Sequence, residues 1–266
     1  MKRWLALSAV LLGISVAFAA EPKKQEWTVD GVKREALVVE PSKKTESPPL
    51  VFGFHGHGGT MANAARSFAF HKHWPEAVVV YMQGLNTPGR LTDPDGTKPG
   101  WQSTAGDQKD RDLKFFDAVL ATMKQDHKID AKRVYSSGHS NGGGFTYLLW
   151  ATRGEAFAAF GPSASTPGKD AKALKPKPVI HIAGENDPLV KFAWQKATLD
   201  YVRKLNGCEP EGKMWAKNAM EYSSKTGTPV VAFIHAGDHK YPAEAPELIV
   251  KFFQQHPASA AQSPSK

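Results

Sequence analysis

The sequence predicts an α/β fold in which helices cover both faces of a mainly parallel sheet. Short apolar runs alternate with longer stretches of helical periodicity, and the runs are apolar throughout, as in strands that are buried on both faces. A further observation concerns the start of the chain, where Asp30 and Gly31 separate two strand-like segments in EWTVDGVKREALVV. The expected sheet therefore carries an N-terminal antiparallel hairpin at one edge.

The elements of this fold follow one another in a regular order. The run PPLVFGFHG predicts a buried strand that ends near Phe54, and after it come a Gly-rich loop, a helix to about Arg66 and the strand AVVVYM. A helix over about 110–127 precedes the strand RVYSSG, and the next helix begins at Ser140. The remaining elements are the strands AFAAFG and PVIHIAG, a helix over about 192–205, the strand PVVAFIH and a helix over about 244–256.

Two connections bear on the functional site. Roughly thirty residues follow Met82, in the segment QGLNTPGRLTDPDGTKPGWQSTAGDQ, and connections of that length are usually functional or disordered. We expect this segment to lie beside the site. Only SASTPGKDAKALKPK separates the strand AFAAFG from the strand PVIHIAG, which leaves no room there for a large helical lid. An open site suits a bulky or polymeric substrate.

The ends of the chain carry separate signals. The 266 residues fit one compact domain over 20–256, with a disordered tail over 257–266. Residues 1–19 place two basic residues before an apolar run that ends in Ala-Phe-Ala, as a cleavable signal peptide does. An uncleaved anchor is the alternative, but the run is short for a bilayer span. We therefore expect a secreted or periplasmic protein with no membrane span after cleavage.

Charge and cysteine content narrow the possible partners. The formal net charge is +8, and it is spread thinly along the chain. This charge serves solubility, or it attracts acidic polysaccharide, cell-wall polymer or anionic lipid, and no nucleic-acid partner is expected. Cys208 is the only cysteine, so the exported chain can form no internal disulfide. Stability must then come from burial of the core.

The pentapeptide Gly138-His139-Ser140-Asn141-Gly142 is the strongest functional signal. It lies between the strand RVYSS and the helical stretch GGFTYLLWAT, which is the context of the nucleophile elbow of α/β-hydrolases. In such an elbow a sharp turn exposes the serine hydroxyl at the carboxyl edge of the sheet, and small residues let strand and helix approach. A Gly-rich helix N-terminus is the alternative interpretation. The elbow predicts Ser140 as a nucleophile in an α/β-hydrolase fold.

A serine nucleophile needs a general base, and the base needs an acceptor that fixes its tautomer. His239 is the best placed of the 10 histidines, because it follows the strand PVVAFIH and comes last in the order Ser, Asp, His. Asp187 follows the strand PVIHIAG and is the predicted acid. Glu185 is the alternative acid, and helix capping is the other interpretation of either carboxylate.

The loop HGHGG follows the strand LVFGF, where α/β-hydrolases place part of the oxyanion hole. The expected donors are the backbone amides of His57 and Asn141. A plain glycine turn is one alternative. Metal binding is another alternative. His55 and His57 form one H-x-H pair and His71 and His73 form a second, although no acidic ligand is suitably spaced. We expect neither a metal nor a cofactor.

Four segments together resemble the polyhydroxybutyrate depolymerase-like and feruloyl esterase family, a carbohydrate esterase branch of the α/β-hydrolases. They are HGHGGT, IDAKRVYSSGHSNGGG, GENDPLV and GDHKYP. The family pattern D-x-x-R-V-Y running into G-x-S-N-G-G is matched from Asp130 to Gly143, and Pro242 closes the histidine loop. The resemblance implies a serine esterase that acts through an acyl-enzyme, and it implies that Trp101 borders the acyl pocket as a substrate-binding residue.

The resemblance leaves the natural ester open. Tyr241 stands where the family has a loop tryptophan, His139 replaces an apolar or small residue, and the paired cysteines of many members are absent. The expected substrates are feruloyl or acetyl esters of polysaccharide, or short polyhydroxyalkanoates. An acyltransferase or peptidase on the same triad is the alternative activity. A non-catalytic binding protein is the alternative class, but all the candidate catalytic residues are present.

Overall fold

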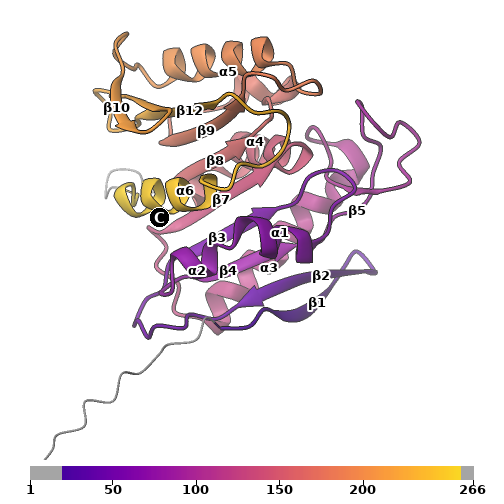
Figure 1. Ribbon diagram of the computed structural model, residues 1–266. Helices are drawn as coiled ribbons and strands as arrows, with labels where there is room; N and C mark the ends of the chain where they lie inside the picture. Colours follow the sequence, from indigo (N-terminus) through magenta and orange to yellow (C-terminus); the bar gives the residue numbers. More distant parts are fainter. Residues whose placement is uncertain (1–19, 259–266) are drawn as a thin grey trace, which may run out of the picture.

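A ten-stranded sheet forms the centre of the protein, shown in Figure 1 as a computed structural model that describes residues 20–258. The predicted signal segment, 1–19, and most of the predicted tail, 259–266, lie outside the described residues. The strands of this sheet are β1 (Lys23–Val29), β2 (Val32–Val39), β3 (Leu50–Phe54), β4 (Val78–Met82), β7 (Val134–His139), β8 (Ala159–Ser163), β9 (Val179–Gly184), β10 (Lys213–Ala216), β11 (Ala219–Tyr222) and β12 (Val230–His235). Their spatial order is β1-β2-β4-β3-β7-β8-β9-β12-β11-β10.

The middle of the sheet is parallel, from β4 through β3, β7, β8 and β9 to β12. Successive side chains of a strand point to opposite faces, so these apolar runs feed two core layers. In β3, Phe52 and Phe54 pack in one layer and Val51 packs in the other. The predicted mainly parallel sheet is confirmed. Its carboxyl edge gathers the ends of all these strands on one side of the molecule.

Both edges of the sheet are antiparallel. β1 and β2 form the predicted hairpin, whose turn residues Asp30 (φ 50°) and Gly31 (φ 76°) adopt the left-handed conformation that a tight two-residue turn requires. At the far edge, β10 and β11 form a second hairpin beside β12. No apolar run predicts this second hairpin, because both strands are four residues long and mostly accessible to solvent.

Helices cover both faces of the sheet, as predicted (Figure 1). The helices are α1 (Met61–Phe68), α2 (Phe70–His73), α3 (Arg111–Asp126), α4 (Asn141–Arg153), α5 (Phe192–Leu205) and α6 (Ala245–Gln255). Buried residues of α3, α4 and α5 pack in one core layer, and those of α1, α2 and α6 pack in the other. Within residues 20–258, no helix combines the length and hydropathy that a membrane span requires.

One strand is displaced from its predicted position. The strand expected over AFAAFG begins only at Ala159, because residues 154–156 form a turn of 3₁₀ helix after α4. That turn closes with a hydrogen bond of 3.2 Å from the Phe157 amide to the Gly154 carbonyl. β8 instead extends to Ser163, whose carbonyl accepts a hydrogen bond from the Ser140 amide.

Candidate active site

Ser140 lies in a strained turn between β7 and α4. Its backbone has φ 56° and ψ −122°, a conformation that non-glycine residues rarely adopt. The glycines around it are required for space, because a Cβ on Gly138 would collide with the Gly142 carbonyl and a Cβ on Gly142 would collide with the Phe54 carbonyl. The Ser140 amide donates to the Ser163 carbonyl over 2.9 Å. The local sequence thus folds into a sharp turn that holds the serine at the carboxyl edge of the sheet.

Three of the predicted site residues meet at that edge. Ser140 Oγ lies 2.8 Å from His239 Nε2, and His239 Nδ1 lies 2.8 Å from Asp187 Oδ2. An ionised carboxylate can only accept, so Nδ1–H of a neutral His239 donates to Asp187 and the serine hydroxyl donates to Nε2. The Asp187 side chain is fully buried, whereas that of His239 is 19% exposed. The arrangement can move a proton from Ser140 to His239.

Asp187 is held by more than His239. Its Oδ1 accepts from the backbone amides of Leu189 and Val190, each over 2.9 Å, and its Oδ2 also accepts from Gln195 Nε2 over 3.2 Å. Glu185, the alternative acid, is exposed and has no hydrogen bond to His239 among the described residues. The geometry therefore favours Asp187 as the residue that orients the histidine.

Gln195 was not among the residues that the sequence singled out. Its side chain is fully buried on α5, where Nε2 donates to the Val190 carbonyl over 2.7 Å and to Asp187. His181 on β9 is buried as well, and its Nδ1 lies 2.8 Å from the Tyr147 hydroxyl. Burial lowers the pKa of His181 to about 4, so this ring is neutral at pH 7. A buried glutamine on an amphipathic helix has no sequence signature, and only packing reveals it.

We expect Gln195→Met to lower kcat on p-nitrophenyl acetate by about tenfold or more with little change in KM, since a hydrogen bond to a charged group is worth ~1.5–3 kcal/mol. Methionine keeps the volume but removes the donor to Asp187. Steady-state kinetics and a thermal melt should be measured together. Gln254→Met, on the exposed side of α6, is the matched control. Wild-type kcat in a folded Gln195→Met protein would show that this contact is dispensable.

The predicted oxyanion donors are the backbone amides of His57 and Asn141, and Asn141 follows Ser140 directly in sequence. Among the described residues, no hydrogen bond occupies the backbone amide of His57, in the loop 55–59, or that of Asn141, at the start of α4. The Asn141 side chain is held by Trp101, whose amide donates to Oδ1 over 2.6 Å and whose carbonyl accepts from Nδ2 over 3.0 Å. Free amides at a helix start can bind a developing negative charge.

The long connection after β4 reaches the same site through Asp93. His57 Nε2 lies 2.9 Å from Asp93 Oδ2, and the carboxylate also accepts from Thr97 and from the Lys98 amide. These hydrogen bonds, with that from His57 the largest influence, hold the pKa of the Asp93 carboxyl well below its ordinary value. Asp93 therefore stays ionised and ties the long connection to the loop that carries the His57 amide.

Three of the four histidines in the two H-x-H pairs have other partners. His55 Nε2 accepts from the Gly84 amide over 3.0 Å, His57 pairs with the carboxylate described above, and His71 Nδ1 lies 2.9 Å from the Tyr81 hydroxyl. Burial lowers the pKa of His55 to about 4. Across residues 20–258, no three potential metal ligands gather into one group.

Trp101 corrects a prediction. The ring is 0% exposed and packs in the core, 5.2 Å from the Phe145 ring and 5.2 Å from the Phe54 ring. Its Nε1 donates to the His55 carbonyl over 2.9 Å. The expectation that Trp101 lines the substrate pocket is therefore wrong. The Asn141 side chain fixes the Trp101 backbone, and the His55 carbonyl accepts from the indole N–H. The ring therefore packs against α4, and the Trp101 backbone contacts the residue that follows Ser140.

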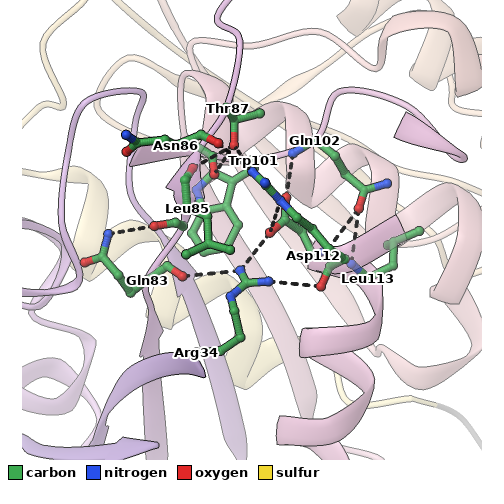
Figure 2. Close-up of polar contacts among 12 residues, drawn as sticks. Arg34, Gln83, Leu85, Asn86, Thr87, Trp101, Gln102, Asp112 and Leu113 are labelled. Atoms are coloured by element: carbon green, nitrogen blue, oxygen red, sulfur yellow. Dashed lines mark hydrogen bonds and ion pairs between the residues drawn. The ribbon is translucent and has the colours of Figure 1, made fainter. Parts of the chain in front are cut away.

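A buried ion pair anchors the long connection behind Trp101, as Figure 2 shows. Arg34 on β2 contacts Asp112 on α3 over 2.7 Å, with side chains 1% and 0% exposed. Arg34 also donates to the carbonyls of Arg111 and Gln83, and Asp112 Oδ2 accepts from the Gln102 amide over 2.9 Å. Removing one partner of such a pair leaves a buried charge and costs about 3–5 kcal/mol. The network fixes the segment that positions Trp101.

A cavity of about 780 Å³ opens beside Ser140. The long connection forms one wall, as predicted, and the segment after β8 and the start of α5 form the others. The residues that line it are His57, Gly89, Arg90, Leu91, Thr92, Ser103, Thr104, Asp107, Ser140, Asn141, Gly144, Ser165, Thr166, Gly168, Lys169, Leu189, Val190 and Trp194.

The sheet, the helices on both faces and the elbow define an α/β-hydrolase. Residues 27–159, half of the chain, match the family described as acetyl xylan esterase (AXE1). The chain belongs to this family and so to the carboxylic ester hydrolases. Its resemblance to the feruloyl esterases, predicted from the motifs, is also confirmed by the relatives below.

Two relatives illustrate the similarity. A bifunctional acetylxylan esterase/xylanase of Neocallimastix patriciarum is 31% identical over 239 residues, which cover 78% of this chain but only 33% of that enzyme. Feruloyl esterase C of Emericella nidulans is 27% identical over 226 residues, covering 77% of this chain and 78% of that protein. The chain thus spans about a third of the bifunctional enzyme and most of the feruloyl esterase.

Solved structures show the same fold. An acetyl xylan esterase from Aspergillus awamori has a TM-score of 0.65 at 12% identity, covering 87% of this chain and 99% of that one. A CE1 ferulic acid esterase from Anaeromyces mucronatus, in complex with ferulic acid, has a TM-score of 0.63 at 14% identity and covers 92% of this chain and 93% of that one. At these identities the likeness concerns the fold alone.

Proposed function

We propose that the protein hydrolyses acetyl or feruloyl esters on plant polysaccharide, with Ser140 as nucleophile, His239 as general base and Asp187 as the residue that orients the histidine. The observation that carries the proposal is the continuous chain of hydrogen bonds from Ser140 Oγ through His239 to Asp187, each 2.8 Å long. The names of the relatives support the choice of ester.

The reaction proceeds in two halves. His239 Nε2 takes the hydroxyl proton as Ser140 Oγ attacks the ester carbonyl, and the amides of His57 and Asn141 stabilise the oxyanion. The imidazolium, stabilised by Asp187, then gives its proton to the sugar oxygen, which leaves as an alcohol. In the second half His239 removes a proton from a water molecule as the water oxygen attacks the acyl-enzyme carbonyl. The bond between the acyl carbon and Ser140 Oγ then breaks, the acid leaves, and His239 returns its proton to Ser140 Oγ.

We propose further that the protein is exported, to the periplasm or outside the cell. The support is the pattern of residues 1–19, in which two basic residues precede an apolar run that ends in small residues. Polymeric plant polysaccharide does not cross a cell membrane, so an enzyme that acts on it must meet it outside the cytoplasm.

A release assay tests the function. Acetylated xylan, methyl ferulate, a hydroxybutyrate oligomer and p-nitrophenyl esters of increasing acyl length should be compared by kcat/KM. We expect short or aryl acyl groups to be preferred, since each added methylene gains ~0.8 kcal/mol only where a pocket buries it, and the cavity beside Ser140 is open. A steady rise towards long acyl chains would contradict the proposal and indicate a lipase.

A further inference from the structure

We propose that the cavity beside Ser140 is a subsite for an acidic sugar chain, in which Trp194, with Leu91 and Leu189, stacks on a sugar ring while Arg90 and Lys169 bind carboxylate groups of the polymer. The inference rests on the proposed ester hydrolysis and deepens it, because it names the class of polysaccharide. It assigns the aromatic platform to Trp194, since Trp101 is buried in the core.

The apolar side chains of this subsite are unusually exposed. Leu91 is 58% exposed, Leu189 39% and Trp194 47%, and all three line the same cavity. They are three of the seven large hydrophobic side chains that are exposed within residues 20–258; the others are Val32, Tyr201, Met214 and Met220. Exposed apolar groups that gather around one hollow, and do not scatter singly over a surface, indicate a binding site.

Trp194 is next in sequence to Gln195, the residue of α5 that contacts Asp187. It lies in the first turn of α5, where its amide donates to the Lys191 carbonyl over 2.9 Å. The next residue, Gln195, is buried and bonds to Asp187. One turn of helix thus fixes the position of Asp187 and presents an indole ring to the cavity. An indole face is a suitable surface for the apolar C–H face of a sugar ring.

The cavity is much larger than the acyl group that the reaction needs. Cavities of ~300–1,000 Å³ hold ligands of drug size, and this one measures about 780 Å³. An acetyl group has only three heavy atoms besides the ester oxygen and fills a small part of that volume. The remainder is available to the alcohol side of the ester, which in a polysaccharide is a chain of sugar rings.

The charges around the cavity favour a negatively charged polymer. Arg90 and Lys169 line it, and neither has a carboxylate within salt-bridge distance among the described residues. Asp170, beside Lys169, is occupied, because it accepts from the Thr104 hydroxyl and from the Ala105 amide. Within residues 20–258, Asp107 is the one carboxylate that lines the cavity, and it can accept from sugar hydroxyls. A neutral sugar needs no cation, whereas a uronate carboxylate binds Arg and Lys.

The first experiment compares two acetylated xylo-oligosaccharides that differ only in whether their glucuronic acid branch is carboxylate or reduced to the neutral alcohol. The measured quantity is kcat/KM on each, divided by kcat/KM on p-nitrophenyl acetate. We expect the acidic substrate to be preferred by about tenfold at low ionic strength, and the preference to vanish in Arg90→Gln/Lys169→Gln and at high salt. Equal rates on both substrates at low salt would overturn the assignment of the cations.

The second experiment tests the platform. Trp194→Ala should lower kcat/KM on both oligosaccharides, relative to kcat/KM on p-nitrophenyl acetate, by about tenfold, because it removes one aromatic stack and the apolar area that the stack buries. Trp194→Phe should restore most of the lost kcat/KM. Met214→Ala and Lys217→Gln, exposed and outside the cavity, are the controls and should not change kcat/KM. If Trp194→Ala weakens methyl ferulate but neither oligosaccharide, the ring holds an aryl acyl group and the proposal is wrong.

Binding measured without catalysis separates this inference from the proposed function. Titration calorimetry of Ser140→Ala with the deacetylated acidic oligosaccharide should give binding that Trp194→Ala weakens about tenfold. Binding with no ester hydrolysis in the wild type would overturn the proposed function and keep the subsite. Hydrolysis of p-nitrophenyl acetate with no oligosaccharide binding would keep the esterase and overturn the subsite.

Discussion

Ser140→Ala is expected to abolish turnover of p-nitrophenyl acetate, with a loss in kcat of about a millionfold, because oxyanion binding alone cannot replace the missing nucleophile. Ser140 already occupies its strained backbone conformation with a Cβ atom, so alanine adds no steric demand there. The fold should stay intact. Steady-state kinetics measure the loss, and a thermal melt together with circular dichroism checks the fold.

Chemical labelling gives an independent control for this prediction. A serine-directed phosphonate should modify the wild-type protein at Ser140, and peptide mass spectrometry locates the label. Ser223 is exposed and does not line the cavity, so Ser223→Ala should be modified by the phosphonate and should turn over substrate as the wild type does. Near-wild-type turnover of Ser140→Ala, with no label at that residue in the parent protein, would remove the central claim.

Asp187→Asn is expected to lower kcat by about a thousandfold or more, by analogy with triads whose carboxylate has been neutralised. The amide that replaces one carboxylate oxygen donates where Oδ2 accepted, so His239 can be held with its Nδ1 unprotonated and its Nε2 protonated. That tautomer cannot take the proton of Ser140. The kinetics on p-nitrophenyl acetate measure the effect.

Glu185→Gln is the matched control for the acid. It removes one carboxylate two residues away on an exposed side chain, and we expect kcat to stay close to that of the wild type. The comparison ranks the two acids directly. A larger loss in Glu185→Gln than in Asp187→Asn would mean that the wrong carboxylate was chosen.

Much of the fold follows from short-range patterns. The helices expected over 110–127, 192–205 and 244–256 correspond to α3, α5 and α6 within one residue at each end. The second antiparallel edge escapes prediction because β10 and β11 are short and mostly accessible to solvent. Their pairing with each other, and that of β11 with β12, therefore leaves no apolar run in the sequence.

Some residues of the site could likewise be predicted from the sequence, and others could not. Ser140, Asp187 and His239 can be predicted because each follows a strand, and parallel strands bring their carboxyl ends to one edge. Gln195 cannot be predicted, because its role depends on which side of α5 faces Asp187. Which tryptophan lies at the cavity is a matter of packing, because Trp101 is buried in the core whereas Trp194 lines the cavity.

The sequence alone determined the order of the parallel strands and of the longer helices, the sharp turn at Ser140 and the chain order of the three proposed catalytic residues, since these depend on periodicity and on glycines in contiguous segments. The tertiary structure decided which side chains face the cavity. Asn141 and the His55 carbonyl draw Trp101 into the core, and the start of α5 turns Trp194 outward. Burial depends on contacts between segments distant in sequence, which local patterns do not contain.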